Sequence, residues 1–163
     1  LKGQLISLIY SIIIIFIIMT IVFRSIVGGV LATFPMVISV VMMFGLMGYT
    51  GIPLNMTTSF LTCILVGVGI DYTIHFLWHL RDHIREGDSL DDAIAKTLKI
   101  SGKGILFNGL SVVIGFSALL FSVFVPVKIF GVLVMGSISF CLFGALATLP
   151  ALTSLINPKF LYK

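Results

Sequence analysis

The chain has 163 residues and a mean hydropathy of +1.23, and only 10% of its residues are charged. Soluble domains carry about 25% charged residues, so this composition excludes a soluble globular domain and predicts a membrane protein. The net charge of +4 does not predict nucleic-acid binding, because the basic residues flank apolar segments and form no single patch.

The first half of the chain contains three apolar segments, each of which approaches or exceeds the roughly 20 residues needed to cross a bilayer. The first covers residues 5–23 and ends at Arg24. The second covers residues 26–47 and contains Pro35, which is expected to kink a helix because it lacks a backbone donor. A stretch rich in turn-forming residues then precedes the third segment, residues 57–80.

The second half begins with a polar segment. Residues 81–103 hold five of the ten basic and five of the six acidic residues, so this segment is expected in water. Within it, a capping box and apolar residues at four-residue intervals predict an amphipathic surface helix over residues 89–101. Two further spans follow at residues 105–124 and 127–156. The predicted fold is therefore all-α membrane, with five transmembrane helices plus one cytoplasmic amphipathic helix.

The distribution of basic residues predicts the orientation. Five spans place eight of the ten basic residues on one side and only Lys2 and Lys128 on the other. The side richer in lysine and arginine is expected in the cytoplasm, which leaves the amino end outside. We therefore expect a multi-pass protein of the inner or plasma membrane, with a single transmembrane domain over residues 1–163. Because the amino end is predicted to lie outside, we also expect an earlier span before Leu1.

Asp71 is the only acidic residue in the middle of a predicted span. A charge at the bilayer centre costs about 3 kcal/mol, so desolvation favours the protonated carboxyl, and the side chain is expected to face the helix bundle. A carboxyl that gains and loses a proton at this depth is what proton coupling requires. Asp71 is thus the candidate proton-relay residue, and a hydrogen-bonded packing role is the alternative.

Three histidines follow Asp71 at four-residue intervals, so a polar stripe is expected along one face of its helix. If the stripe is a proton path, His75 is the relay partner, although it could equally be a plain interhelical hydrogen-bonder. His79 and His83 fall at the membrane edge, where interfacial anchoring explains them. A metal site would need its ligands in a dry pocket, so we predict no metal and no cofactor.

Small and polar residues indicate where the helix of Asp71 meets its neighbours. Gly67 and Gly69 allow another helix to approach closely. In the fourth span, Asn108 and Ser111 lie on a face of small and polar residues that is expected to meet the third span. Ser111 is closest in depth to Asp71 and is a candidate hydrogen-bond donor to it, although such faces also serve packing alone.

The run Gly-Val-Gly-Ile-Asp-Tyr-Thr-Ile-His at residues 67–75 resembles the resistance-nodulation-division superfamily, most closely its lipid-exporting and Patched-like branches. The Gly-Ile-Pro-Leu-Asn stretch at 51–55 and Ile-Gly-Phe at 114–116 resemble it too. In that superfamily such a five-helix unit is part of each half of the membrane domain. The resemblance implies that Asp71 and Tyr72 form a proton-relay pair, helped by the other half of the parent protein.

The function implied by the resemblance is the membrane portion of a proton-driven exporter of hydrophobic or lipid-like molecules. Its partners would be membrane lipids, the other half and an extracytoplasmic porter domain, and a homo-oligomer is compatible with it. The alternative is a sterol-sensing-type lipid-binding module that does not pump. A subunit of the protein-export machinery has less support, because the Asp-Tyr run resembles the exporters. An enzyme is not expected, since no nucleophile and base are paired at a suitable spacing.

Overall fold

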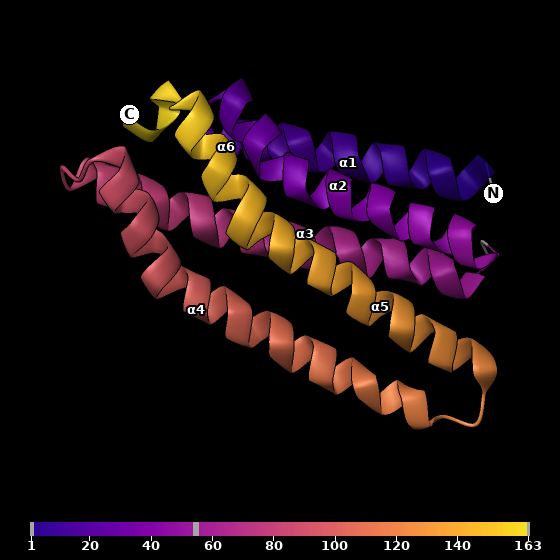
Figure 1. Cartoon of the computed structure of the whole chain (residues 1–163). Helices are drawn as coiled ribbons and strands as arrows, with labels where there is room; N and C mark the ends of the chain where they lie inside the picture. Colours follow the sequence, from indigo (N-terminus) through magenta and orange to yellow (C-terminus); the bar gives the residue numbers. More distant parts are fainter. Residues whose placement is uncertain (1, 54–55, 163) are drawn as a thin grey trace.

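The computed structural model describes residues 2–53 and 56–162, and every regular element within these ranges is helical. Five helical stretches are long and apolar enough to cross a membrane, which confirms the expected all-α membrane fold with five spans. Figure 1 shows them as long rods that run back and forth through the molecule. The α-helices are α1 (Lys2–Phe23), α2 (Ile26–Thr50), α3 (Met56–Arg85), α4 (Leu90–Ser117), α5 (Val125–Phe143) and α6 (Leu149–Ile156).

A tight hairpin joins α1 to α2. Arg24 forms its corner in the left-handed conformation, with φ of 49°. A Cβ atom on Gly28 would lie 2.7 Å from Cβ of Phe23, and one on Gly29 would overlap the hydroxyl oxygen of Thr20. The chain therefore requires glycine where α2 starts back along α1.

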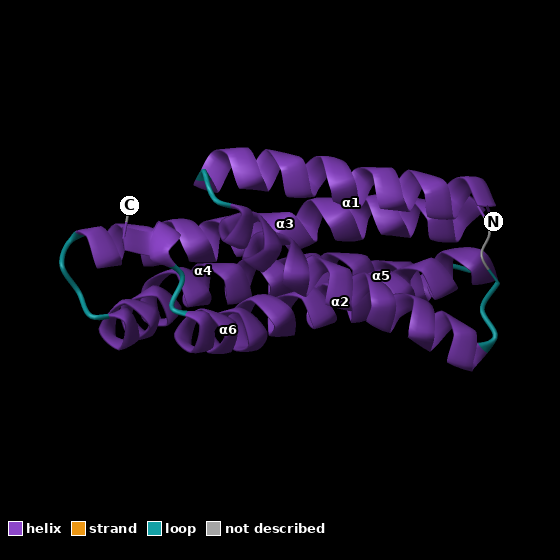
Figure 2. Ribbon diagram, turned by 90° about the horizontal axis from the view of Figure 1, so that it is seen from above, coloured by secondary structure: helices purple, strands orange, loops and turns teal. Residues whose placement is uncertain are grey.

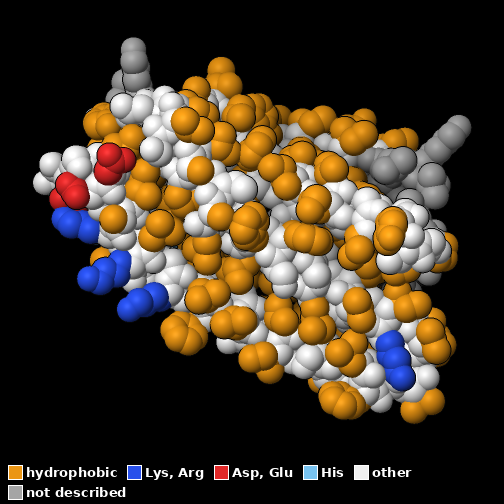
Figure 3. Space-filling model, in the orientation of Figure 1, with side chains coloured by type: hydrophobic (Ala, Val, Ile, Leu, Met, Phe, Trp, Pro, Cys, Tyr) orange, Lys and Arg blue, Asp and Glu red, His pale blue; other side chains and the backbone are white. Residues whose placement is uncertain are grey.

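The core lies between α2, α3 and α5. Met36, Leu65, Phe76 and Ile138 are each no more than 1% exposed. The buried share of the residues is only 17% in the first span (α1) and 11% in the fourth (α4), whereas it is 50% in the second (α2). The helices α1 and α4 therefore flank the core. Figure 2 shows α1 along one edge of the bundle, and Figure 3 shows apolar side chains over most of the visible face. In a membrane protein such apolar surface is suited to contact with lipid chains.

The fifth span contains an irregular segment. A π-helical stretch, Gly144–Thr148, joins α5 to α6, and Pro150 stands at the start of α6. Because proline has no backbone N–H, the regular hydrogen-bond pattern cannot continue through it, and a local π-turn accommodates the change. A Cβ on Gly144 would lie 3.0 Å from Cβ of Pro35, so α2 packs closely on this segment.

The joint between α3 and α4 differs from the prediction. The surface helix expected at residues 89–101 is helical, but it is continuous with the fourth span and forms the first turns of α4. Ser89 caps this helix by accepting a hydrogen bond from the backbone N–H of Asp92 at 3.3 Å. A break between surface helix and span would leave two more helix ends with unsatisfied backbone groups, which explains the continuity. Gly87, with φ of 101°, makes the preceding turn.

Charged groups gather at one end of the molecule. The carboxyl end of the chain and the α3–α4 joint lie at the same end, whereas the amino end and the α4–α5 turn lie at the other (Figure 1). Figure 3 shows acidic and basic side chains at the first end, which we call the charged end. The sequence predicts that this end faces the cytoplasm.

Candidate functional site

Asp71 lies halfway along α3, with 15 positions back to Met56 and 14 forward to Arg85. Its side chain is exposed on the surface of the five-span unit and forms no ion pair with the described residues. The expectation that it faces into this bundle is therefore wrong. Tyr72 and Phe76, both almost fully buried, occupy the inward face of α3, and Asp71 projects from another side.

Tyr72, the next residue, is buried and only 1% exposed. Its hydroxyl has no hydrogen-bond partner among the described residues. A Cβ on Gly109 would lie 3.3 Å from this hydroxyl, so the hydroxyl rests against α4 at mid-depth. A buried polar group without a partner is uncommon in folded proteins and calls for a physical explanation, such as an ordered water.

A cavity of about 310 Å³ lies between α3 and α4 beside this hydroxyl. It brings together three of the predicted site residues, whereas Asp71 is not part of its lining. Sequence reasoning did not assign two polar residues of the cavity, His79 and Ser101, to the site. Each lies four positions, about one helical turn, from another lining residue of the same helix. The lining residues are Tyr72, His75 and His79 of α3 and Ser101, Gly104, Ile105 and Asn108 of α4.

The remaining predicted support residues contribute unequally to the site. A Cβ on Gly69 would lie 3.0 Å from Sγ of Cys141, so Gly69 permits close packing between α3 and α5. Gly67 is exposed and has open space around it. Ser111 is also exposed, and its hydroxyl donates to the carbonyl of Phe107 at 2.8 Å. No hydrogen bond between Ser111 and Asp71 is present in the described structure.

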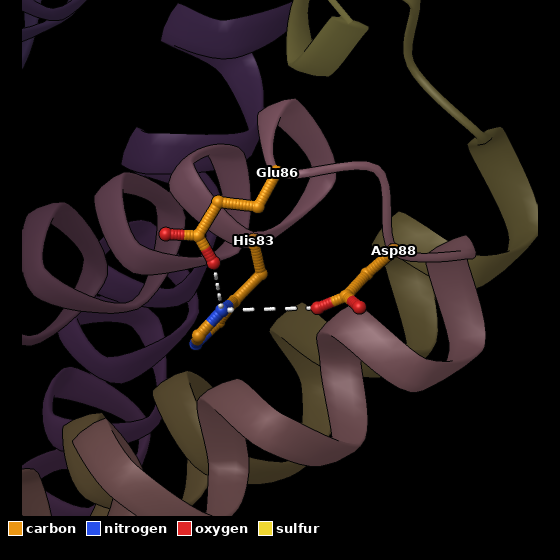
Figure 4. A group of neighbouring side chains, drawn as sticks. All are labelled: His83, Glu86 and Asp88. Atoms are coloured by element: carbon orange, nitrogen blue, oxygen red, sulfur yellow. Dashed lines mark ion pairs between the residues drawn. The ribbon is translucent and has the colours of Figure 1, made fainter.

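A group of titratable side chains closes the α3–α4 joint at the charged end. Figure 4 shows His83 pointing toward two carboxylates: its Nδ1 lies 3.4 Å from Oε2 of Glu86 and 3.9 Å from Oδ2 of Asp88. These three side chains could in principle hold a metal ion, since their ligand atoms lie within 4.8 Å of one another. Lys96 already contacts Asp88 at 2.6 Å, however, and Glu86 is 73% exposed. We interpret the group as a charge network that links α3 to α4.

Five membrane-length helices, one with a carboxylate at its midpoint, define a multi-pass membrane protein with an ionisable group at membrane depth. The model of the MMPL family matches residues 2–161, and the chain belongs to this family. The resemblance to the transmembrane half of the resistance-nodulation-division superfamily is thereby confirmed.

Known relatives extend well beyond the region matched here. A membrane protein of Methanocaldococcus jannaschii is 33% identical over 85% of this chain and 36% of its own length. The transport protein MmpL12 of Mycobacterium tuberculosis is 28% identical over 67% of this chain and 10% of its own length. The sulfolipid-1 exporter MmpL8 of the same organism is 30% identical over 64% of this chain and 10% of its own length. No solved structure gives a significant match.

Proposed function

We propose that this chain is the transmembrane portion of a proton-driven exporter of hydrophobic or lipid-like molecules, with Asp71 as its proton-relay carboxylate. Membership of the MMPL family and the similarity to a sulfolipid exporter support the transport class. The observation that carries the proposal is the position of Asp71, at the midpoint of a spanning helix and on an exposed side. A permanent charge there would be costly in lipid, so the carboxyl requires a protein partner or a proton.

The exposed side of α3 is the proposed contact with the other half of the transporter. Asp71 and His75 are both exposed on α3, and Asn108 and Ser111 are exposed on α4. Polar groups at membrane depth normally face a protein interior or a water-filled space, so a second membrane half would cover them. The chain spans about a third or less of the length of these relatives, which leaves room for that half and for a porter domain.

Within this scheme, each residue of the relay has a distinct role. Asp71 binds and releases the proton, and protonation removes the charge that opposes close contact with lipid or with an apolar partner surface. His75 lies one helical turn along the same face, at the four-residue spacing that brings side chains together. Tyr72 supplies a hydroxyl that can both donate and accept a hydrogen bond, and this hydroxyl lies at the cavity between α3 and α4. The resulting change in helix packing would drive the porter domain.

The proposal is tested by Asp71→Asn in the complete protein, because an amide keeps the shape of the side chain but cannot exchange a proton. Efflux of a fluorescent hydrophobic probe is measured from vesicles under an imposed pH gradient, and membrane insertion is checked for each variant. We expect Asp71→Asn to abolish proton-dependent efflux. The matched control, Asp91→Asn, makes the same change at an exposed position near the start of α4 and should keep the wild-type rate.

Export at the wild-type rate by Asp71→Asn would make Asp71 a packing residue and refute the relay. A wild-type protein that gains stability from added lipid but shows no response to the pH gradient would instead favour the sterol-sensing-type module.

A further inference from the structure

The cavity between α3 and α4 contains buried polar groups that protein contacts leave unsatisfied. The hydroxyl oxygens of Tyr72 and Ser101 are both buried and lack hydrogen-bond partners among the described residues. The whole Tyr72 side chain is only 1% exposed, and it forms the inner end of the lining. Hydroxyls in this situation are commonly satisfied by ordered water, provided that the space is polar and large enough.

The positions of the lining residues along α3 and α4 show in which direction the cavity runs. On α3 it extends from position 72 to position 79, which corresponds to about 10 Å along the helix. On α4, which runs the opposite way, it extends over the same length, from position 101 to position 108. The cavity therefore leads from mid-depth at Tyr72 toward the charged end. Its volume of about 310 Å³ would hold about ten water molecules at about 30 Å³ each.

From this geometry we infer that the cavity is a water-filled vestibule that connects Tyr72 with the aqueous phase at the charged end. The imidazoles of His75 and His79 and the amide of Asn108 provide further hydrogen-bond partners for a chain of waters. His79 is then a residue of the vestibule mouth instead of an interfacial anchor. The purpose of the vestibule rests on the proposed function: protons exchanged at the Asp71–Tyr72 pair would travel through it.

Cysteine labelling tests for water in the vestibule. The complete protein, with Cys63→Ser and Cys141→Ala, receives either Asn108→Cys in the lining or Leu106→Cys outside it. A charged, membrane-impermeant thiol reagent is then added from the charged end. Only a thiolate reacts, and a thiol ionises readily only in contact with water. We expect Asn108→Cys to react at least ~10-fold faster than Leu106→Cys, and equal rates would overturn the inference.

A plug variant tests whether the reagent enters through the cavity. Gly104 lines the cavity, and a Cβ added there would have open space around it, so the larger side chain of Gly104→Leu is expected to fill part of the vestibule. It should slow the labelling of Asn108→Cys by ~10-fold, since a thiol shut off from water stays protonated. Gly115→Leu is the matched control, because Gly115 has equally open space on the same helix outside the cavity.

If Gly104→Leu leaves the labelling rate of Asn108→Cys unchanged, water does not reach position 108 through this cavity, and the inference is overturned. The labelling experiment does not depend on transport. Fast labelling together with wild-type export by Asp71→Asn would therefore refute only the proposed function, whereas slow labelling with loss of export would refute only the vestibule.

Discussion

At the scale of single residues, Asp71 and Tyr72 are neighbours in sequence but face different surroundings. Asp71 is exposed on the surface of the unit, whereas Tyr72 is buried beside the cavity with an unpartnered hydroxyl. Consecutive residues on an α-helix point about 100° apart, which follows from its 3.6 residues per turn. The pair can therefore contact a partner surface on one side and a cavity on the other.

Tyr72→Phe should separate a role in the relay from a role in folding. The hydroxyl makes no protein hydrogen bond among the described residues, so its removal should change the free energy of unfolding by no more than about 1 kcal/mol. Proton-dependent efflux should fall, but less than in Asp71→Asn. Thr73→Val is the control, because it removes a buried hydroxyl that only donates to the carbonyl of Gly69. Equal efflux from Tyr72→Phe and the wild type would exclude the hydroxyl from the relay.

At the scale of elements, the contacts between helices depend on where glycine removes a side chain. The α1–α2 hairpin closes on Gly28 and Gly29, α3 meets α5 at Gly69, and the π segment meets α2 at Gly144. Close approach of backbones allows extensive van der Waals contact, which is a main source of helix association within lipid. Gly45, by contrast, lies in α2 with open space around it.

Gly29→Ala should destabilise the α1–α2 hairpin by about 1–3 kcal/mol, because the added methyl group would overlap Thr20 and force the helices apart. Gly45→Ala makes the same change on the same helix without a clash, so it should cause no loss of stability. Thermal unfolding midpoints in one detergent compare the two variants. A midpoint for Gly29→Ala equal to that of Gly45→Ala would contradict the close contact.

At the scale of the whole molecule, most charge is concentrated at one end of a bundle whose sides are apolar. Exposed Ile17, Ile21 and Phe107 are suited to contact with lipid chains, and the charge network of the α3–α4 joint lies at the charged end. This arrangement agrees with five crossings and opposite locations for the two ends of the chain.

The predicted orientation places the charged end in the cytoplasm, in accord with the excess of basic residues there. In a background without Cys63 and Cys141, an impermeant thiol reagent added outside intact cells should label Lys128→Cys but not Glu86→Cys. Both positions are exposed in the structure, so differences in burial do not affect the comparison. Labelling of Glu86→Cys from outside would reverse the topology.

The sequence by itself determined the number and approximate extent of the spans, because runs of apolar residues are read independently of their neighbours. It also identified Asp71 as the unusual residue, since a carboxylate in an apolar run stands out without any knowledge of packing. The family resemblance added the pairing with Tyr72.

The tertiary structure decided which side of each helix packs against a neighbour and which side stays exposed. The exposed side of Asp71, the continuity of α4 through residues 89–101 and the cavity that joins His79 to Ser101 depend on how α3 and α4 lie against each other. Apolar periodicity is a weak guide to such contacts in a membrane protein, because lipid and the protein interior are both apolar. Only the packed helices showed which polar groups share one space.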